Sequence, residues 1–491
     1  MFRLAAVGIG LLPIALIELG LRFAGVAADQ PVLTQVDSQL GGLNAIDTDP
    51  LLDLHALRPL FVLSADGTRM EIAAERMNFF CPASFPVEKG ASTLRVFALG
   101  GSTTQGQPYR TETSFAHWLS LRLQAAAPHR EIEVVNCGGI SYASYRVTAI
   151  LQEVLGYSPD LILLYTGHNE FLEARTYELQ QRVPRWLAGP LSIVNRLRIS
   201  RVVAYAFTDN QPMHRTAMTG EVDTLLDHAD GLESYTRDLD WSDGVQAHFE
   251  SKLAEMVDAC RAASVPLVLC VPASDLVNTP PFKSTSDPSL SVELQKQVDL
   301  WLRDAESEST LREMRINAAK SILSVDPEHA MANYVLGRFD FESAMYEGAK
   351  QNAPDMLRHL IAARDRDVCP LRATTRIETA VRNYRDKQNI VFVDTPSILD
   401  QKNAREQRIP DGIADPRWFV DHVHPTIEGH QAIATAIYQQ LVNNDWITPV
   451  DNADEVYAQR VVAHLKTLGE EYFGRAEQRL DGVKRWSRRI K

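Results

Sequence analysis

The chain has 491 residues, of which 45% are hydrophobic and 23% charged, and its formal net charge is −13. This length is too great for one small core, so we expect two or more structural units. The acidic balance argues against nucleic acid as a partner, because phosphate binding needs a basic surface. The five cysteines form no CxxC pair, which argues against a zinc ribbon or a thioredoxin-type redox site.

Residues 1–28 form an apolar N-terminal segment. Its charge-free run Leu4–Ile17 suits the hydrophobic region of a signal peptide. The longer stretch Leu4–Ala28 is long enough to cross a bilayer as one helix, in which Glu18 and Arg22 would partner each other four residues apart. We favour an uncleaved membrane anchor over a cleaved signal. Either interpretation puts the bulk of the chain in the periplasm or outside the cell.

Five short apolar runs are typical of buried parallel strands. They are Leu94–Leu99, Ile132–Val135, Leu161–Tyr165, Leu267–Val271 and Ile390–Val393. Helical stretches such as Ser114–Ala127 and Ala247–Ala263 lie between them. This alternation predicts an α/β fold with a doubly wound, five-stranded parallel sheet. We assign residues 93–288 and 388–445 to this domain, preceded by a lead segment over 29–92.

Two segments interrupt the alternation, and a third follows it. Residues 173–241 lack a clear strand and are predicted to form a helical cap. Residues 289–387 are predicted to form a helical insertion, in which Ala332 and Gly337 fall where tetratricopeptide units place small packing residues. One such unit cannot bury its own face, so we expect it to lean on the sheet domain and to be able to bind a protein partner. Residues 446–491 are predicted to form an amphipathic, helical tail.

Residues with chemical functions follow the ends of the predicted strands. Ser102 follows the first strand, a glycine-containing loop the second, and Asn169 the third, while Asp421 and His424 lie beyond the fifth. Ligands of such sheets bind beyond the carboxyl ends of the strands. A hydroxyl, an imidazole and a carboxylate meeting there are the groups that nucleophilic acyl transfer needs.

The order of these motifs resembles the SGNH hydrolases, also called the GDSL esterase/lipase superfamily. That family has a serine after the first strand, a glycine loop after the second, a G-x-N-D loop after the third and a D-x-x-H segment near the C-terminus. Ser102, Gly167-x-Asn169 and Asp421-x-x-His424 match three of these four blocks. The resemblance implies a serine esterase with a flavodoxin-like fold and no cofactor. Ser102 would be the nucleophile, His424 the base and Asp421 its partner.

The resemblance also implies an oxyanion hole. It would consist of the backbone N–H of Ser102, the side-chain amide of Asn169 and a backbone N–H of the second loop. In that loop the family's glycine position falls on Ser141, and Gly139 is the alternative donor.

Two departures from the family pattern concern residues outside the triad. Gly101 stands where the family has the aspartate of GDSL, and Glu170 stands where it has the aspartate after the asparagine. Neither change removes a catalytic group, so we expect catalysis to survive, with Glu170 holding its loop.

Other interpretations of these residues concern metals and packing. Asp421, His422 and His424, with His168, could cluster around a metal, but no HExxH or cysteine pattern accompanies them, and we expect no metal. We interpret His422 as a packing residue rather than the base, because it is adjacent to Asp421. Asn136 is interpreted as holding its loop.

Arginines crowd the end of the insertion. Alternating charges in this segment are typical of a solvated helix face, although arginine also suits a carboxylate or phosphate on a substrate. We take Arg372 and Arg376 as candidates for substrate binding.

The sequence therefore predicts a membrane-anchored serine esterase acting on a small-molecule or glycan O-acyl ester. One alternative is an O-acyltransferase with the same triad, in which a sugar hydroxyl replaces water. The other is a non-catalytic scaffold that binds a protein partner through the insertion.

Overall fold

The computed structural model describes residues 59–173, 222–347, 353–400 and 412–488. The predicted anchor over residues 1–28 and most of the predicted cap over 173–241 lie outside the described residues. Within the described ranges, no helix is both long enough and apolar enough to span a membrane.

Five parallel strands form the central sheet, in the order β5-β4-β6-β7-β8. They are β4 (Thr93–Gly100), β5 (Glu131–Gly138), β6 (Leu161–Tyr165), β7 (Leu267–Cys270) and β8 (Ile390–Val393). Each lies where an apolar run predicts it, which confirms the doubly wound α/β sheet. In the register, Val96 of β4 pairs with Val134 on one side and Leu161 on the other.

The central strand is buried on both faces, as expected of a parallel sheet covered by helices on both sides. All eight residues of β4 are buried. Val96 and Ala98 belong to one apolar cluster with Trp118 and Ile433. Phe97 instead contacts the ring of Phe85, with 5.2 Å between centroids. Successive side chains of β4 thus pack into the cores on opposite faces of the sheet, as the alternation of side chains along a strand requires.

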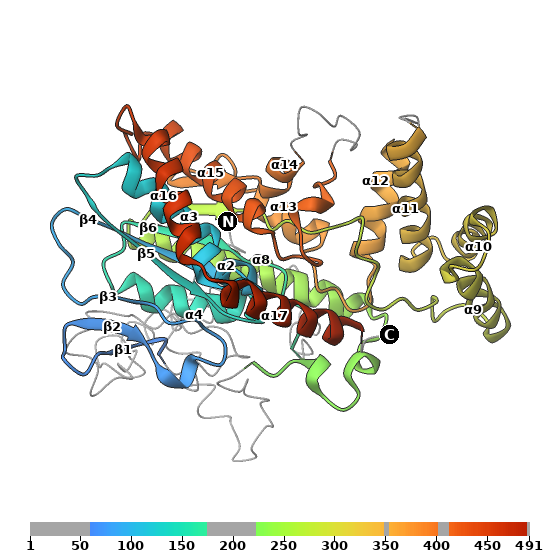
Figure 1. Cartoon of the computed structure of the whole chain (residues 1–491). Helices are drawn as coiled ribbons and strands as arrows, with labels where there is room; N and C mark the ends of the chain where they lie inside the picture. The colour runs from blue at the N-terminus through green and yellow to red at the C-terminus, as the bar shows by residue number, and fades with distance from the viewer. Residues whose placement is uncertain (1–58, 174–221, 348–352, 401–411, 489–491) are drawn as a thin grey trace, which may run out of the picture. The chain divides into compact units, whose positions relative to one another are not determined.

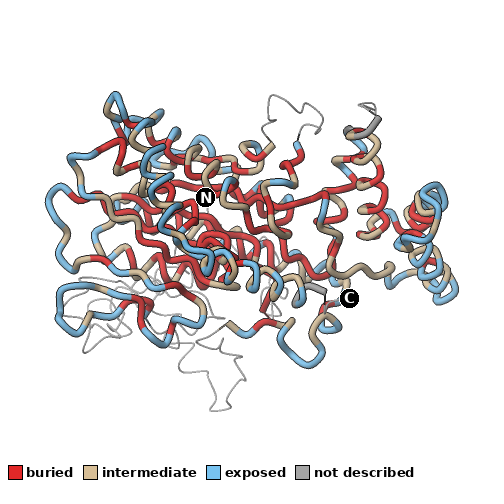
Figure 2. The backbone as a smooth tube through the Cα atoms, viewed as in Figure 1, coloured by how far each residue is buried: buried red, intermediate tan, exposed pale blue. Residues whose placement is uncertain are grey.

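Helices cover the two faces of the sheet (Figure 1). The helices of one face are α3 (Phe115–Ala126), α14 (Thr395–Leu399) and α15 (Ile427–Asn443). Those of the other face are α4 (Ser144–Leu155), α8 (Leu239–Ala262) and α13 (Thr375–Arg382). Buried residues concentrate along the sheet and the sides of the helices that face it (Figure 2).

The described part of the lead segment forms a second, antiparallel sheet that the sequence did not predict. Its strands are β1 (Phe61–Leu63), β2 (Arg69–Ile72) and β3 (Ser84–Pro86). The carboxylate of Glu153 on α4 accepts hydrogen bonds from the backbone N–H groups of Leu60 and Phe61, at 2.7 and 2.8 Å. Strands of three or four residues are too short to show an apolar alternation, which explains the omission.

The segment over 289–387 is helical and forms two hairpins before α13. The hairpin helices are α9 (Val292–Glu306), α10 (Arg312–Val325), α11 (Ala330–Glu347) and α12 (Ala353–Asp365). A Cβ added to Gly337 of α11 would lie 2.8 Å from Leu360 Cγ of α12, so the second hairpin depends on a small residue there. Tyr334 ties the insertion to the sheet domain through a 2.8 Å hydrogen bond to the carbonyl of Val277. A tetratricopeptide relationship stays a prediction.

The C-terminal tail consists of α16 (Ala453–Thr467) and α17 (Glu470–Arg488). Arg122 of α3 forms a 2.6 Å ion pair with Asp454. Tyr472 of α17 shares a 2.8 Å hydrogen bond with Thr113. The tail is therefore held against α3 and the loop that precedes it.

Candidate active site

A sharp turn from β4 into the short helix α2 (Ser102–Gln105) presents the serine. A Cβ added to Gly100 would lie 2.0 Å from the carbonyl oxygen of Tyr165 on the neighbouring strand. No residue but glycine fits so close an approach of two backbones. Thr104 donates a 3.1 Å hydrogen bond to the same carbonyl. The turn is fixed at this point, and Ser102 remains partly exposed.

Ser102, His424 and Asp421 form a continuous hydrogen-bonded chain. Ser102 Oγ lies 2.8 Å from His424 Nε2, and His424 Nδ1 lies 2.7 Å from Asp421 Oδ2. Ser102 directly follows the turn at the end of β4, whereas Asp421 and His424 lie in the loop that precedes α15. The structure thus brings together the three residues that the sequence predicted for catalysis.

Asp421 is fixed by more than the imidazole. Its Oδ1 accepts hydrogen bonds from the backbone N–H groups of Val423 and His424, at 3.0 and 2.9 Å. Burial alone would raise the pKa of Asp421, but the neighbouring His424 and His422 and these hydrogen bonds outweigh it and hold the pKa below its usual value. The carboxylate is therefore ionised and acts only as an acceptor.

The ionised carboxylate determines the tautomer of His424. An acceptor at Nδ1 requires the proton to be on that nitrogen, which leaves the Nε2 lone pair facing Ser102 Oγ. The hydroxyl of Ser102 then donates to Nε2. This is the arrangement in which an imidazole can take the proton of an attacking serine.

Asn169 lies beside the nucleophile turn. Its Nδ2 donates a 3.1 Å hydrogen bond to the carbonyl of Tyr142, in the loop after β5. A Cβ added to Gly101 would lie 2.6 Å from this nitrogen. Because Gly101 has no side chain, the amide of Asn169 can lie where the aspartate of the GDSL pattern would begin. An amide has two N–H groups, so one remains for a ligand.

The two candidate donors of the second loop differ in availability. The N–H of Gly139 already donates to the carbonyl of Gly100 at 3.0 Å, so it is the less available donor. Ser141 has a φ of 61°, the left-handed conformation that glycine adopts readily and serine can adopt at a cost. The loop thus keeps a glycine-like backbone at Ser141, whose N–H makes no hydrogen bond within the described residues.

Two further polar residues hold these loops. Asn136 donates to the carbonyl of Thr104 at 2.8 Å and accepts from the N–H of Gly138 at 2.9 Å. Glu170 accepts from both the N–H and the hydroxyl of Ser144, each at 2.8 Å. Both therefore position loops, in agreement with the roles predicted for them.

Buried histidines surround the triad. Burial lowers the pKa of His422 to about 4, against an opposing effect of Asp421, and burial lowers the pKa of His430 to about 3. His168 accepts a 3.1 Å hydrogen bond from the N–H of Ala373. His422 packs against the ring of Phe282 at 5.1 Å. The described residues contain no group of three or more histidine, cysteine or acidic side chains placed to hold a metal.

The two arginines predicted to bind substrate have protein partners. Arg372 is only 2% exposed and donates to the carbonyls of Asp275 and Thr279 at 3.0 and 2.9 Å. A substrate role at Arg372 therefore finds no support in its contacts. Arg376 is partly exposed and pairs with Glu250 and Asp243; its role in binding stays a prediction.

Contacts of the backbone carbonyls could not be read from the sequence. The carbonyl of Tyr142 orients Asn169, and the carbonyl of Val423 accepts a 3.4 Å hydrogen bond from Thr103 beside the nucleophile. Any residue supplies a carbonyl, so no residue type signals either contact.

Comparisons with known proteins give one family match. Residues 98–312 match the sequence model of the GDSL-like Lipase/Acylhydrolase family. No curated protein matches the sequence.

Similar solved structures include three with low sequence identity. LAE5, an alpha/beta hydrolase enzyme from the metagenome of Lake Arreo, is 14% identical, with 72% of this chain and 96% of that chain covered and a TM-score of 0.31. The acetylxylan esterase Axe2 from Geobacillus stearothermophilus is 14% identical, with 72% and 94% covered and a TM-score of 0.29. A GDSL-like lipase from Bacteroides thetaiotaomicron is 12% identical, with 71% and 88% covered and a TM-score of 0.28.

The triad geometry and the family match define the class of the protein: it is a hydrolase that acts on esters. More narrowly, residues 98–312 of this chain are similar to the GDSL-like Lipase/Acylhydrolase family.

Proposed function

We propose that the chain hydrolyses an O-acyl ester through an acyl-serine intermediate on Ser102. The observation that carries the proposal is the unbroken chain of hydrogen bonds from Ser102 Oγ through His424 to Asp421, at 2.8 and 2.7 Å. A nucleophile, a base and a residue that orients the base are the complete set that the reaction needs.

In the first half of the reaction, Ser102 Oγ attacks the carbonyl carbon and its proton passes to His424 Nε2. The carbonyl oxygen becomes an oxyanion, for which the free N–H groups of Ser102, Ser141 and Asn169 are the proposed donors. The C–O bond to the alcohol then breaks, and His424 returns the proton to the departing oxygen. Asp421 stabilises the transient imidazolium throughout.

In the second half, water attacks the acyl-serine. His424 accepts a proton from the water, the tetrahedral species collapses, and Ser102 Oγ leaves and regains its proton. The products are the carboxylic acid and the free enzyme. A sugar hydroxyl in place of water would give acyl transfer by the same steps.

A fluorophosphonate probe, which phosphonylates activated serines, tests the assignment. We expect labelling of the wild-type chain, with the modified peptide containing Ser102, and no labelling of the variant Ser102→Ala. The same variant should lose about 10⁴-fold or more in ester turnover. A folded wild-type protein that stays unlabelled would instead favour the scaffold alternative.

We further propose that the natural substrate is an acylated glycan of the cell envelope and that residues 1–28 anchor the chain in the membrane. The apolar stretch Leu4–Ala28, which is long enough to cross a bilayer as one helix, supports the anchor. Fractionation of cells that express the full chain or residues 29–491 tests it. The full chain should sediment with membranes and resist extraction by carbonate, whereas residues 29–491 should not.

A further inference from the structure

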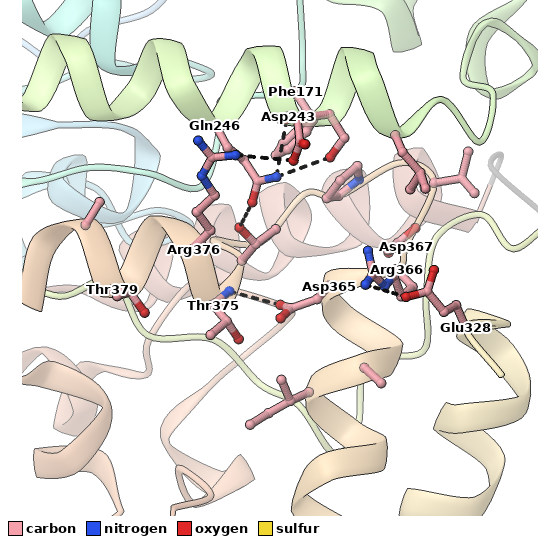
Figure 3. A pocket seen from close by; sticks show the side chains of 18 of the residues that line it. Phe171, Asp243, Gln246, Glu328, Asp365, Arg366, Asp367, Thr375, Arg376 and Thr379 are labelled. Atoms are coloured by element: carbon pink, nitrogen blue, oxygen red, sulfur yellow. Dashed lines mark hydrogen bonds and ion pairs between the residues drawn. The ribbon is translucent and has the colours of Figure 1, made fainter. Parts of the chain in front are cut away.

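One pocket lies away from the triad. It has a volume of about 1230 Å³ and is formed by α8, α11, α12, α13 and adjoining loops. Ser102, Asp421 and His424 are not among its lining residues. The pocket adjoins the loop after β6, because Phe171 of that loop lines it and the neighbouring His168 accepts a hydrogen bond from Ala373. Figure 3 shows Arg376 extending from α13 toward α8 across it.

The charges of the lining nearly cancel. The five basic lining residues are Arg237, Arg358, Arg366, Arg376 and Lys387, and the six acidic ones are Asp238, Asp243, Glu250, Glu328, Asp365 and Asp367. Several are paired with one another: Arg376 Nε lies 2.6 Å from Glu250 Oε1, and Arg366 lies 2.5 Å from Glu328. Arg376 and Arg366 each lie beside an acidic residue of the lining, which an anion bound to either cation would also meet, so the lining suits a neutral ligand.

The ion pairs leave both donors and acceptors open to the pocket. Arg376 uses one N–H on each of its three nitrogens for Glu250 and Asp243, so two of its five N–H groups remain. Asp365 accepts through Oδ1 from Arg364 and from the N–H of Thr375, and Oδ2 makes no hydrogen bond within the described residues. A hydroxyl donates and accepts at once. A polyhydroxylated ligand therefore matches this alternation of groups.

The volume of the pocket and one aromatic side chain in its lining restrict the class of ligand further. Pockets for a single drug-sized ligand measure about 300–1,000 Å³, and this one is larger. Trp241 lines it, is partly exposed and packs edge to face with Phe171 and Tyr235; an indole ring offers a broad apolar face to the C–H groups of a sugar ring. We infer that this pocket binds a neutral oligosaccharide, at a site distinct from the ester-cleaving triad. The inference does not require the acyl-serine chemistry proposed above.

Isothermal titration of the full-length variant Ser102→Ala tests the inference without turnover. The probes are cellohexaose, xylohexaose and chitohexaose, with hexagalacturonate as the anionic comparison. We expect saturable binding of at least one neutral probe and weaker binding of hexagalacturonate. No binding of any neutral probe at millimolar concentration, or preferred binding of the anionic one, would overturn the inference.

Variants made in the same Ser102→Ala background locate the binding. Thr379 is exposed on α13 and lines the pocket, so Thr379→Trp fills the space without removing an ion pair and should abolish binding. Arg376→Ala should weaken binding about 10-fold or more, as the loss of a charge-assisted hydrogen bond predicts. Arg385 pairs with Asp394 and does not line the pocket, so Arg385→Ala is the matched control and should bind normally. Undiminished binding by Thr379→Trp would place the sugar elsewhere and refute the assignment.

Discussion

Replacing Asp421 by asparagine tests the part of the site that sets the protonation of His424. Asp421 has two acceptor oxygens, one for two backbone N–H groups and one for the imidazole. Asparagine has one. If its oxygen keeps the backbone donors, its NH₂ group faces Nδ1, which must then accept. The proton moves to Nε2, and His424 can no longer take the proton of Ser102.

The opposite orientation of the asparagine is less favourable. Its NH₂ group would face the N–H groups of Val423 and His424, which would lose their acceptor at a cost of about 1–3 kcal/mol each. We therefore expect the first orientation. A triad in the wrong tautomer loses about 10⁴-fold in kcat, or about 5 kcal/mol of transition-state stabilisation, while the fold persists.

The assay is the hydrolysis of nitrophenyl acetate by wild type, Asp421→Asn and the control Asp415→Asn, with thermal unfolding of each measured in parallel. Asp415 is a similarly buried carboxylate, whose side-chain partner is Arg417, so the control should keep most activity. Activity of Asp421→Asn within tenfold of wild type would refute the tautomer argument. A collapse of thermal stability in that variant would show that its loss of activity reflects folding.

Three other predictions follow from contacts around the triad. Gly101→Ala should push the amide of Asn169 aside and lower kcat about 10²- to 10³-fold, as the loss of an oxyanion donor does. Asn169→Ala should lower kcat by the same factor, and the double variant should lower it little further. Additive losses in the double variant would contradict a shared cause. His424→Ala should be nearly inactive in the same ester assay while His422→Asn retains most activity, and the reverse order would identify His422 as the base. His430 has a pKa of about 3 in the folded protein, below the value of about 6.5 in an unfolded chain. As the pH falls from about 6.5 toward 3, the unfolded state therefore binds more protons than the folded state, and the free energy of unfolding decreases over that range. Lowering the pH from 7 to 4 should cost wild type about 3 kcal/mol at this residue, and His430→Asn, compared by chemical denaturation at both pH values, should lose less stability than wild type; equal losses would show that His430 is not responsible.

The sheet and the triad could be predicted from the sequence because they depend on local pattern and on one rule of topology. Buried parallel strands appear as apolar runs, and their carboxyl ends must share an edge, so residues as distant in sequence as Ser102 and His424 could be placed together. The resemblance to a known family then supplied their roles.

The sequence could not reveal the contacts of two of the predicted site residues. The N–H of Gly139 is consumed by Gly100, and the guanidinium of Arg372 is buried against two carbonyls; neither contact is visible in a local pattern. The pocket beside Arg376 depends on how three helices pack, which the sequence alone could not show.

The insertion between β7 and β8 separates the two halves of the active site in the order of synthesis. The strands that position Ser102, Ser141 and Asn169 are close together in sequence, and β4, which leads to Ser102, pairs directly with both of the others. The strand that leads to Asp421 and His424 joins the sheet last, when Leu267 pairs with Ile390 beyond the helical hairpins. Pairing of strands separated by so long a segment is slow, because a large loop must close before the contacts between the strands form. A chain emerging from the ribosome therefore acquires its nucleophile well before its base, and it remains chemically inert until its C-terminal region has been made and folded.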